Sequence, residues 1–354
     1  MTKSKKSRFH ASDLLVWPGM WLLVLGELGS RLSPEWFAWL APFGLTLALG
    51  WLLVALGWAW RIAAFRWLKV VVPAAVLAMT WPSFNRVFSV GDSYFVTEEQ
   101  PGWGVLTFNV RRLDEFEWLE GDQTRKDLAT WLSKRQEEIW CFQEFPADGK
   151  RMLSRADFSW RTSGKKLLTW PHGTGPAVAT SFKVLGSDSW MFDEETSKGR
   201  VMQVDLESPD GPIRLFNVHL QSLYFSKEDY QAVEQGPTKE ESKRLWGMLM
   251  DAYQGRALQA QGLRKRIEDS PYPVVLAGDF NDSPVSYTMR QLEKGRVRDA
   301  FRSAPIGLGA THIGTVPGLR IDGLLVDTLF SCSGFRTHDV VLSDHRPVSV
   351  QVVK

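Results

Sequence analysis

The pattern of apolar and polar residues divides the chain near residue 90. Before this point Trp, Leu, Ala and Val dominate, and from Phe37 to Trp60 no charged residue occurs for 24 positions. A helix of that length can cross the apolar core of a bilayer, which is about 30 Å thick. The segments Leu14–Leu28 and Trp67–Phe84 are also apolar. We therefore expect residues 1–90 to form a membrane anchor of about three transmembrane helices, followed by a second domain over residues 91–354.

The distribution of basic residues predicts how this anchor is oriented. Basic residues precede the first apolar segment and separate the second from the third: Lys3, Lys5, Lys6 and Arg8, then Arg61, Arg66 and Lys69. The positive-inside rule keeps both groups in the cytoplasm. With three spans the protein is an integral protein of the cell membrane whose second domain is extracytoplasmic, whereas with two spans that domain is cytoplasmic. The first segment could also be a signal-peptide core, although no small-x-small cleavage site follows it.

Beyond residue 90, short apolar runs typical of strands repeatedly end in polar residues. The clearest is Val274–Asp282, in which Asp279 and Asn281 follow a glycine. Residues at i and i+2 of a strand point to the same side, so these two side chains can converge. Similar runs carry the polar residues Asn109, Gln143, Glu144, Asn217, His219, Asp322, Asp344 and His345. Polar groups beside buried runs are costly unless they are paired or bind a metal, so their repetition indicates a site at one sheet edge.

This ordered set of motifs resembles the endonuclease/exonuclease/phosphatase superfamily over about residues 103–354. Its members include secreted DNases, abasic-site endonucleases, inositol-polyphosphate 5-phosphatases and neutral sphingomyelinases. The resemblance implies a DNase I-like α/β fold. This is a four-layer α/β sandwich of two packed mixed sheets flanked by helices, here preceded by the α-helical transmembrane anchor.

The resemblance also implies a role for each motif residue. Glu144 is the leading metal ligand, with Asp344 close by and Asn109 supporting the same Mg²⁺ or Mn²⁺ ion. Asp279 orients or deprotonates the attacking water, and Asn281 donates to a phosphate oxygen. His345 contacts the phosphate while Asp322 holds its ring, and His219 assists the leaving group. Asn217 is expected to contact the substrate.

Several of these residues have simpler interpretations. Asn109 and Asn217 could cap turns at strand ends, and Asp322 could pair with Arg320 or Arg346. His312 lies in a Gly-rich stretch before the strand that carries Asp322, which makes it a further candidate for the site. Arg111, Arg112 and Arg200 could bind phosphate. The segment Glu240–Asp269 has apolar residues at helical spacing, and the preceding Gln221–Pro237 could be a lid or a surface loop.

Charge and cysteine content reduce the number of functions and sites that the sequence supports. Residues 1–90 contain nine Lys or Arg and three Asp or Glu, which leaves 33 basic and 37 acidic residues for the rest of the chain and a net charge of about −4. A domain built for tight nonspecific duplex binding is usually basic. No CxxC or HExxH pattern occurs, so the sequence does not indicate a Cys/His zinc site. Cys141 lies in a run that should be buried, which favours a core position, and a disulfide with Cys332 stays open.

The sequence therefore predicts a membrane-anchored, divalent-metal-dependent phosphoesterase that hydrolyses a phosphodiester or phosphomonoester by metal-assisted attack of water. The substrate could be a nucleic acid, a phospholipid head group or a small molecule. The expected partners are this substrate and the lipid bilayer, and no protein partner is inferred. The alternative is a catalytically silent scaffold or binding module that retains the fold. The presence of Glu144, Asp279 and His345 favours the enzyme.

Overall fold

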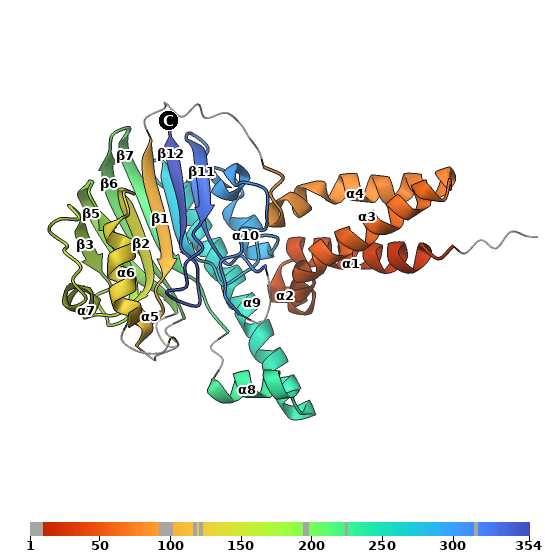
Figure 1. Ribbon diagram of the computed structural model, residues 1–354, viewed down its shortest axis with the longest axis horizontal. Coiled ribbons are helices and arrows are strands. Elements are labelled where there is room, and N and C mark those ends of the chain that lie inside the picture. The colour runs from red at the N-terminus through yellow and green to blue at the C-terminus, as the bar shows by residue number, and fades with distance from the viewer. Residues whose placement is uncertain are drawn as a thin grey trace, which may run out of the picture.

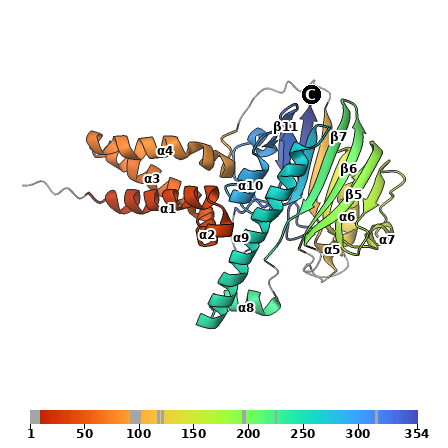
Figure 2. The ribbon, with the colours of Figure 1, turned by 180° about the vertical axis from the view of Figure 1, so that it is seen from behind.

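A computed structural model describes residues 10–91, 102–115, 119, 123–193, 198–223, 226–314 and 318–354. The N-terminal part is helical, with elements α1 (Asp13–Arg31), α2 (Pro34–Phe37), the 3₁₀ helix η1 (Ala38–Thr46), α3 (Leu47–Ala63) and α4 (Trp67–Val87). Helices α1, α3 and α4 lie side by side in an arm that projects from the rest of the molecule (Figures 1 and 2). Within the described residues, two helical segments, Pro34–Ala63 and Trp67–Val87, are long and apolar enough to cross a membrane. This is one fewer than the three spans expected, because α1, which carries Asp13, Glu27 and Arg31, is not among them.

Glycines allow the arm helices to approach one another closely. A Cβ atom on Gly50 of α3 would lie 3.0 Å from the carbonyl oxygen of Gly19 on α1, and one on Gly29 would lie 2.1 Å from that of Leu40. Small residues have this role at contacts between transmembrane helices. The outward side chains are apolar, and Leu68 is 97% exposed and Met79 80% exposed. The arm thus has a closely packed interior and an apolar exterior.

The rest of the chain contains two six-stranded sheets. In spatial order the first sheet consists of β11 (Ser331–Thr337), β12 (Val348–Val353), β1 (Trp103–Asn109), β2 (Ile139–Phe145), β4 (Gly175–Thr180) and β3 (Lys166–Thr169). The second consists of β5 (Lys183–Asp193), β6 (Lys198–Ser208), β7 (Gly211–His219), β8 (Val274–Asp279), β10 (Asp322–Asp327) and β9 (Val297–Asp299). The pairs β1–β2 and β7–β8 are parallel and the other pairs are antiparallel. Both sheets are therefore mixed, as predicted.

Helices cover the outer faces of the two sheets. The remaining helical elements are α5 (Arg111–Asp114), α6 (Gln123–Ser133), α7 (Gly149–Arg155), α8 (Lys227–Gln235), α9 (Lys239–Glu268), α10 (Tyr287–Leu292) and the 3₁₀ helix η2 (Ala300–Ser303). Phe108 and Phe142 of the first sheet pack with Leu128 of α6, and Phe216 of the second sheet packs with Leu263 of α9. A third buried cluster lies between the sheets. The predicted four-layer DNase I-like α/β sandwich is confirmed (Figure 1).

Strand alternation explains why the polar motif residues share one location. Alternate residues of a strand face opposite sides of the sheet. Val105 of β1 and Val275 of β8 belong to the cluster between the sheets. Asn109 and Asp279 are four residues further along the same strands, so they continue that inward-facing series. Because the buried apolar side chains of this cluster end before Asn109 and Asp279, polar side chains lie between the two sheets at the strand ends.

Other expectations can be compared with the structure. Helix α9 confirms the helix expected over Glu240–Asp269. In the segment Gln221–Pro237, α8 forms over Lys227–Gln235, while residues 224 and 225 lie outside the described residues. Cys141 and Cys332 are free, and Cys141 is buried in the core, as favoured.

Candidate active site

The carboxylate of Asp279 is the centre of the candidate site. Asp279 is 1% exposed, and its Oδ2 accepts a hydrogen bond of 3.0 Å from Asn109 Nδ2 on the other sheet. The Nε2 atoms of His219 and His345 lie 3.7 and 3.8 Å from the same oxygen. A glycine is needed at position 278, where φ is 151°, because a Cβ there would lie 2.0 Å from the carbonyl oxygen of Val218. The glycine therefore lets the strand that carries Asp279 lie close to the strand that carries His219. One buried oxygen thus contacts residues from both sheets.

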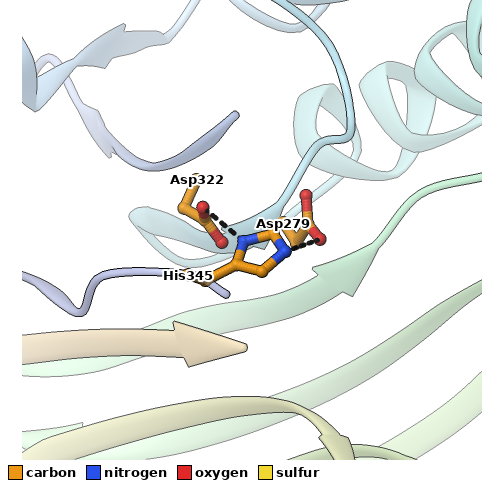
Figure 3. A group of neighbouring side chains, drawn as sticks. All are labelled: Asp279, Asp322 and His345. Atoms are coloured by element: carbon orange, nitrogen blue, oxygen red, sulfur yellow. Dashed lines mark hydrogen bonds and ion pairs between the residues drawn. The ribbon is translucent and has the colours of Figure 1, made fainter. Parts of the chain in front are cut away.

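His345 lies between two carboxylates (Figure 3). Its Nδ1 is 2.8 Å from Asp322 Oδ2, and its Nε2 faces Asp279. Strand β10 runs antiparallel to β8, so the first residue of β10, Asp322, lies opposite the last residue of β8, Asp279. Arg320 pairs with Asp299 and Arg346 with Asp339, so neither of the arginines considered as partners of Asp322 pairs with it in the structure.

Electrostatics determine the charge on this histidine. Burial favours the neutral ring, but the charges of Asp322 and Asp279 outweigh it and raise the pKa of His345 to about 10. Burial, followed by the neighbouring charge of Asp322, raises the pKa of Asp279. His345 is therefore a cation at neutral pH, held between two acidic groups.

Glu144 and Asn281 occupy unusual backbone conformations at strand ends. Both residues have φ 52°, in the left-handed region that is costly for residues other than glycine. The register between β2 and β4 shifts between Phe142 and Phe145, which places Glu144 in an irregularity. Backbone strain of this kind is concentrated at functional sites. The irregularity lets Glu144 leave the strand pattern at the point where the polar residues converge.

The side chain of Glu144 is 32% exposed and is available to a cation. Its Oε1 lies 3.4 Å from Asn109 Nδ2 and 3.8 Å from His219 Nε2. Within the described part of the chain, no lysine or arginine pairs with Glu144. A carboxylate beside an amide suits a hard, oxygen-binding divalent ion such as Mg²⁺ or Mn²⁺.

A second group of potential ligands lies deeper. Ligand atoms of Asp279, Asp322 and His345 all lie within 4.8 Å of one another. Asp322 Oδ1 is buried with no hydrogen-bond partner among the described residues. The imidazolium of His345 already lies between the two carboxylates and supplies the positive charge there. The residues Glu144 and Asn109 therefore fit a metal ion better than this deeper group does.

The other predicted site residues have defined contacts nearby. Asp344 accepts a hydrogen bond from Ser343 Oγ at 3.1 Å, and its Oδ2 lies 3.1 Å from Arg111 Nη1. Asn281 donates from Nδ2 to the carbonyl oxygen of Leu220 at 3.0 Å, while its backbone N–H donates to Asp279 Oδ1. Direct ligation of a metal by Asp344 and donation to phosphate by Asn281 stay predictions.

Asn217 lies inside the interface between the sheets. Its Nδ2 donates to the carbonyl oxygens of Phe142 and Ala177, both at 2.9 Å, and its Oδ1 accepts from Gln143 Nε2 at 2.7 Å. These contacts join strands of the two sheets directly beneath His219. Contact between Asn217 and a substrate stays a prediction.

The structure also identifies residues near the site for which the sequence contained little signal. His312 forms an isolated β-bridge with His345, and the ring centroids are 5.4 Å apart. Its position in a Gly-rich stretch was the only indication. Arg256 of α9 was not anticipated, because that helix was recognised by its apolar residues. It is 2% exposed, pairs with Asp282 at 3.3 Å and donates to the carbonyl oxygen of Gln221, so it supports the loop after Asp279.

Solved structures with the same fold include three informative proteins. A Bacteroides thetaiotaomicron protein of the endonuclease/exonuclease/phosphatase family matches with TM-score 0.55 and 15% identity, covering 72% of this chain and 98% of that one. Humanized D. rerio TDP2 matches with TM-score 0.53 and 14% identity over 71% and 99%. The B. thetaiotaomicron mannosyl-6-phosphatase Bt3783 matches with TM-score 0.52 and 16% identity over 71% and 100%. At these identities the matches establish the fold alone.

No curated protein sequence matches the chain. The sequence model of the Endonuclease/Exonuclease/phosphatase family, however, matches residues 106–345, which include every residue of the candidate site. With the fold and the convergence of the motif residues, this match shows that the chain belongs to the endonuclease/exonuclease/phosphatase family of phosphoester hydrolases.

Proposed function

We propose that this protein is a membrane-anchored hydrolase that cleaves a phosphate ester with the help of Mg²⁺ or Mn²⁺. The observation that carries the proposal is the convergence of Asn109, His219 and His345 on the buried carboxylate of Asp279. Groups of this kind are suited to activating water and stabilising negative charge on a phosphate. The structural neighbours include TDP2 with a single-stranded DNA product and a mannosyl-6-phosphatase, which supports a phosphoester as the substrate class.

The protein groups divide the chemistry among them. Asp279 would orient the attacking water and accept its proton. Its pKa is raised toward neutral pH, which makes the carboxylate a stronger base than an ordinary aspartate. The His345 cation would contact a phosphate oxygen, and Asp322 would keep its ring in place. His219, 3.7 Å from Asp279, would assist the leaving oxygen. Asn281 would donate to the phosphate.

Glu144 and Asn109 would hold the divalent ion, with Asp344 at the edge of the same group. When bound, such an ion supplies positive charge that stabilises the developing charge on the phosphate. Asn217 would contribute by keeping the two sheets in register beneath these residues, in addition to any contact with the substrate.

The arm would anchor the protein in the cell membrane. Helix α1 begins at its outer end and ends near the sheets, α3 returns to the outer end, and α4 leads back again (Figure 1). The connection between α3 and α4 therefore lies at the outer end of the arm together with the start of α1. It carries Arg61 at the end of α3, Arg66 between the helices and Lys69 at the start of α4. If all three helices span the bilayer, the positive-inside rule keeps this end cytoplasmic and the catalytic domain extracytoplasmic.

The test is the metal requirement of Glu144→Gln. Full-length protein in detergent should hydrolyse bis(4-nitrophenyl) phosphate with Mg²⁺ or Mn²⁺, and EDTA should abolish this activity. In Glu144→Gln the ion concentration for half-maximal activity should rise by at least roughly tenfold, because a ligand is weakened. Direct Mn²⁺ binding by calorimetry should weaken in parallel.

The matched control is Glu207→Gln, which removes an exposed carboxylate paired with Lys183. It should leave both measurements unchanged. If Glu144→Gln keeps the wild-type requirement and affinity for the ion, the assignment of Glu144 as a metal ligand is wrong. If wild-type protein hydrolyses no phosphate ester, the enzymatic proposal itself fails.

A further inference from the structure

A polar cavity of about 460 Å³ lies where the arm meets the α/β domain. It is lined by residues at the ends of α1 and α4 nearest the domain, by α10 and the residues directly after it, and by Arg302 of η2. This cavity is separate from the site around Asp279. Its charged lining residues are Arg31, Arg86, Arg290, Glu293, Lys294 and Arg302.

The acids at this cavity neutralise only part of its positive charge. Glu293 pairs with Arg86 and lies 3.8 Å from Arg302, and Arg290 lies 3.4 Å from Glu27. Glu27 also pairs with Arg31 at 2.8 Å. Five lining cations and these two carboxylates leave a net charge of +3.

The positive groups are held in place by contacts across the junction. Arg290 of α10 donates to Ser30 Oγ at 3.0 Å and to Ser83 Oγ at 2.6 Å, so it joins the domain to two arm helices. Burial, followed by the charge of Arg86, lowers the pKa of Arg290 to about 10. An anion in the cavity would relieve this repulsion and accept charge-assisted hydrogen bonds.

The location indicates which anion can reach the cavity. Arg31 ends α1 and Arg86 lies in the last turn of α4. Next to these residues the arm exposes apolar side chains, including Leu28 and Trp81. Arg31 and Arg302 are each 60% exposed, so the cavity is open beside this apolar surface. A molecule with an anionic head and an apolar tail matches both neighbouring surfaces.

We propose that this cavity binds a phosphate-bearing anion, supplied as the head group of an anionic phospholipid. The inference rests on the membrane anchor of the proposed function. It assigns the junction a lipid-binding role distinct from catalysis. The head group would contact the cations between arm and domain, and the acyl chains would follow the exposed face of the arm.

The experiment measures lipid binding to the full chain in detergent by native mass spectrometry. The three probes are phosphatidylglycerol, phosphatidylcholine and inorganic phosphate. The test variant is the double change Lys294→Gln/Arg302→Gln, which leaves the junction contacts of Arg86 and Arg290 intact. The control variant Lys183→Gln/Arg151→Gln also removes two charges, from side chains that are 74% and 63% exposed and lie elsewhere.

Phosphatidylglycerol should bind wild-type protein more tightly than either other probe. The test variant should bind it roughly tenfold or more weakly, and the control variant should bind it like wild type. If the lipid instead bound at the catalytic site as a substrate, the two test substitutions would leave its binding unchanged. Because the measurement is of binding, it does not depend on whether the protein hydrolyses a phosphate ester. Equal binding of the two lipids, equal losses in both variants, or inorganic phosphate bound as tightly as phosphatidylglycerol would each overturn the proposal.

Discussion

The arm and the α/β domain distribute polar and apolar groups in opposite ways. In the arm, glycines such as Gly19 and Gly50 meet inside while apolar side chains such as Met79 face outward. In the domain, aromatic and aliphatic side chains fill the layers, and the buried acid Asp279 and the buried base His345 of the candidate site face each other. The comparison indicates that the two regions suit different surroundings. The arm surface suits hydrocarbon, whereas the domain surface suits water.

The same difference explains why the candidate active site lies in the α/β domain and not in the arm. Buried charges require partners, and the domain supplies them from several strands at one end of its sheets. Among the described residues, the arm groups its ion pairs at its two ends, with Asp13, Arg61 and Lys69 at the outer end and Glu27, Arg31 and Arg86 near the domain. The middle of the arm is apolar, so catalysis is expected only in the domain.

The largest expected effect concerns catalysis by the α/β domain. Asp279→Asn should lower kcat by about 10²- to 10⁴-fold, because the substitution removes the proposed proton acceptor. Thermal stability at pH 7 should not fall. Burial and Asp322 raise the pKa of Asp279, so the charged form costs the fold free energy. Removal of this cost should offset the loss of one of the two hydrogen bonds that the carboxylate accepts, from Asn109 Nδ2 and from the Asn281 N–H.

This prediction is checked by parallel kinetics and thermal unfolding of the full chain. Asp251→Asn, which changes an exposed carboxylate paired with Lys198, should match wild type in both measurements. Near-normal turnover in Asp279→Asn would remove Asp279 from the mechanism.

The second effect tests the arm. Met79→Lys places a charge on the exposed face of α4, which would cost about 3 kcal/mol in a bilayer but within roughly 0.5 kcal/mol at a surface in contact with water. We expect a smaller carbonate-resistant membrane fraction in cells that express this variant, whereas Met79→Leu should behave as wild type. Equal membrane fractions for the two variants would show that this face does not contact lipid.

The smallest effect concerns the stability of the domain at low pH. Burial, followed by Arg135 and Arg336, lowers the pKa of His338 to about 4, and its Nε2 lies 2.8 Å from Ser349 Oγ. The unfolded chain, with a histidine pKa of about 6.5, therefore binds more protons between these pH values. The contribution is fully present above about pH 6.5 and is lost as the pH falls toward 4, and amounts to roughly 1–3 kcal/mol.

His338→Gln should consequently lose less stability than wild type when the pH falls from 7 to 4.5, as measured by denaturant unfolding. The matched control is the exposed His172→Gln, which should retain the wild-type pH dependence. Identical pH dependence in wild type and His338→Gln would contradict the assignment.

The sequence anticipated the domain because its signals are local. Short apolar runs that end in polar residues, such as Val274–Asp279, identify strands. The ordered motifs identify the family and the set of residues to examine. The left-handed conformations of Glu144 and Asn281 could not be anticipated, because they depend on how neighbouring strands pair. The burial of Arg256 depends on Asp282, which lies beyond the helix that contains Arg256.

By itself, the sequence determined the layered α/β class, the apolar N-terminal region and the residue types able to hydrolyse a phosphate ester. The apolar N-terminal region follows from composition, whereas the layered class and the roles of the site residues follow from the resemblance of the ordered motifs to a known family. Only the tertiary structure decided that His345 lies between Asp279 and Asp322, that Asn109 joins Asp279 from the other sheet, and that cations gather between arm and domain. The physical reason is that the energies of buried charges depend on distances between residues that are far apart in the chain.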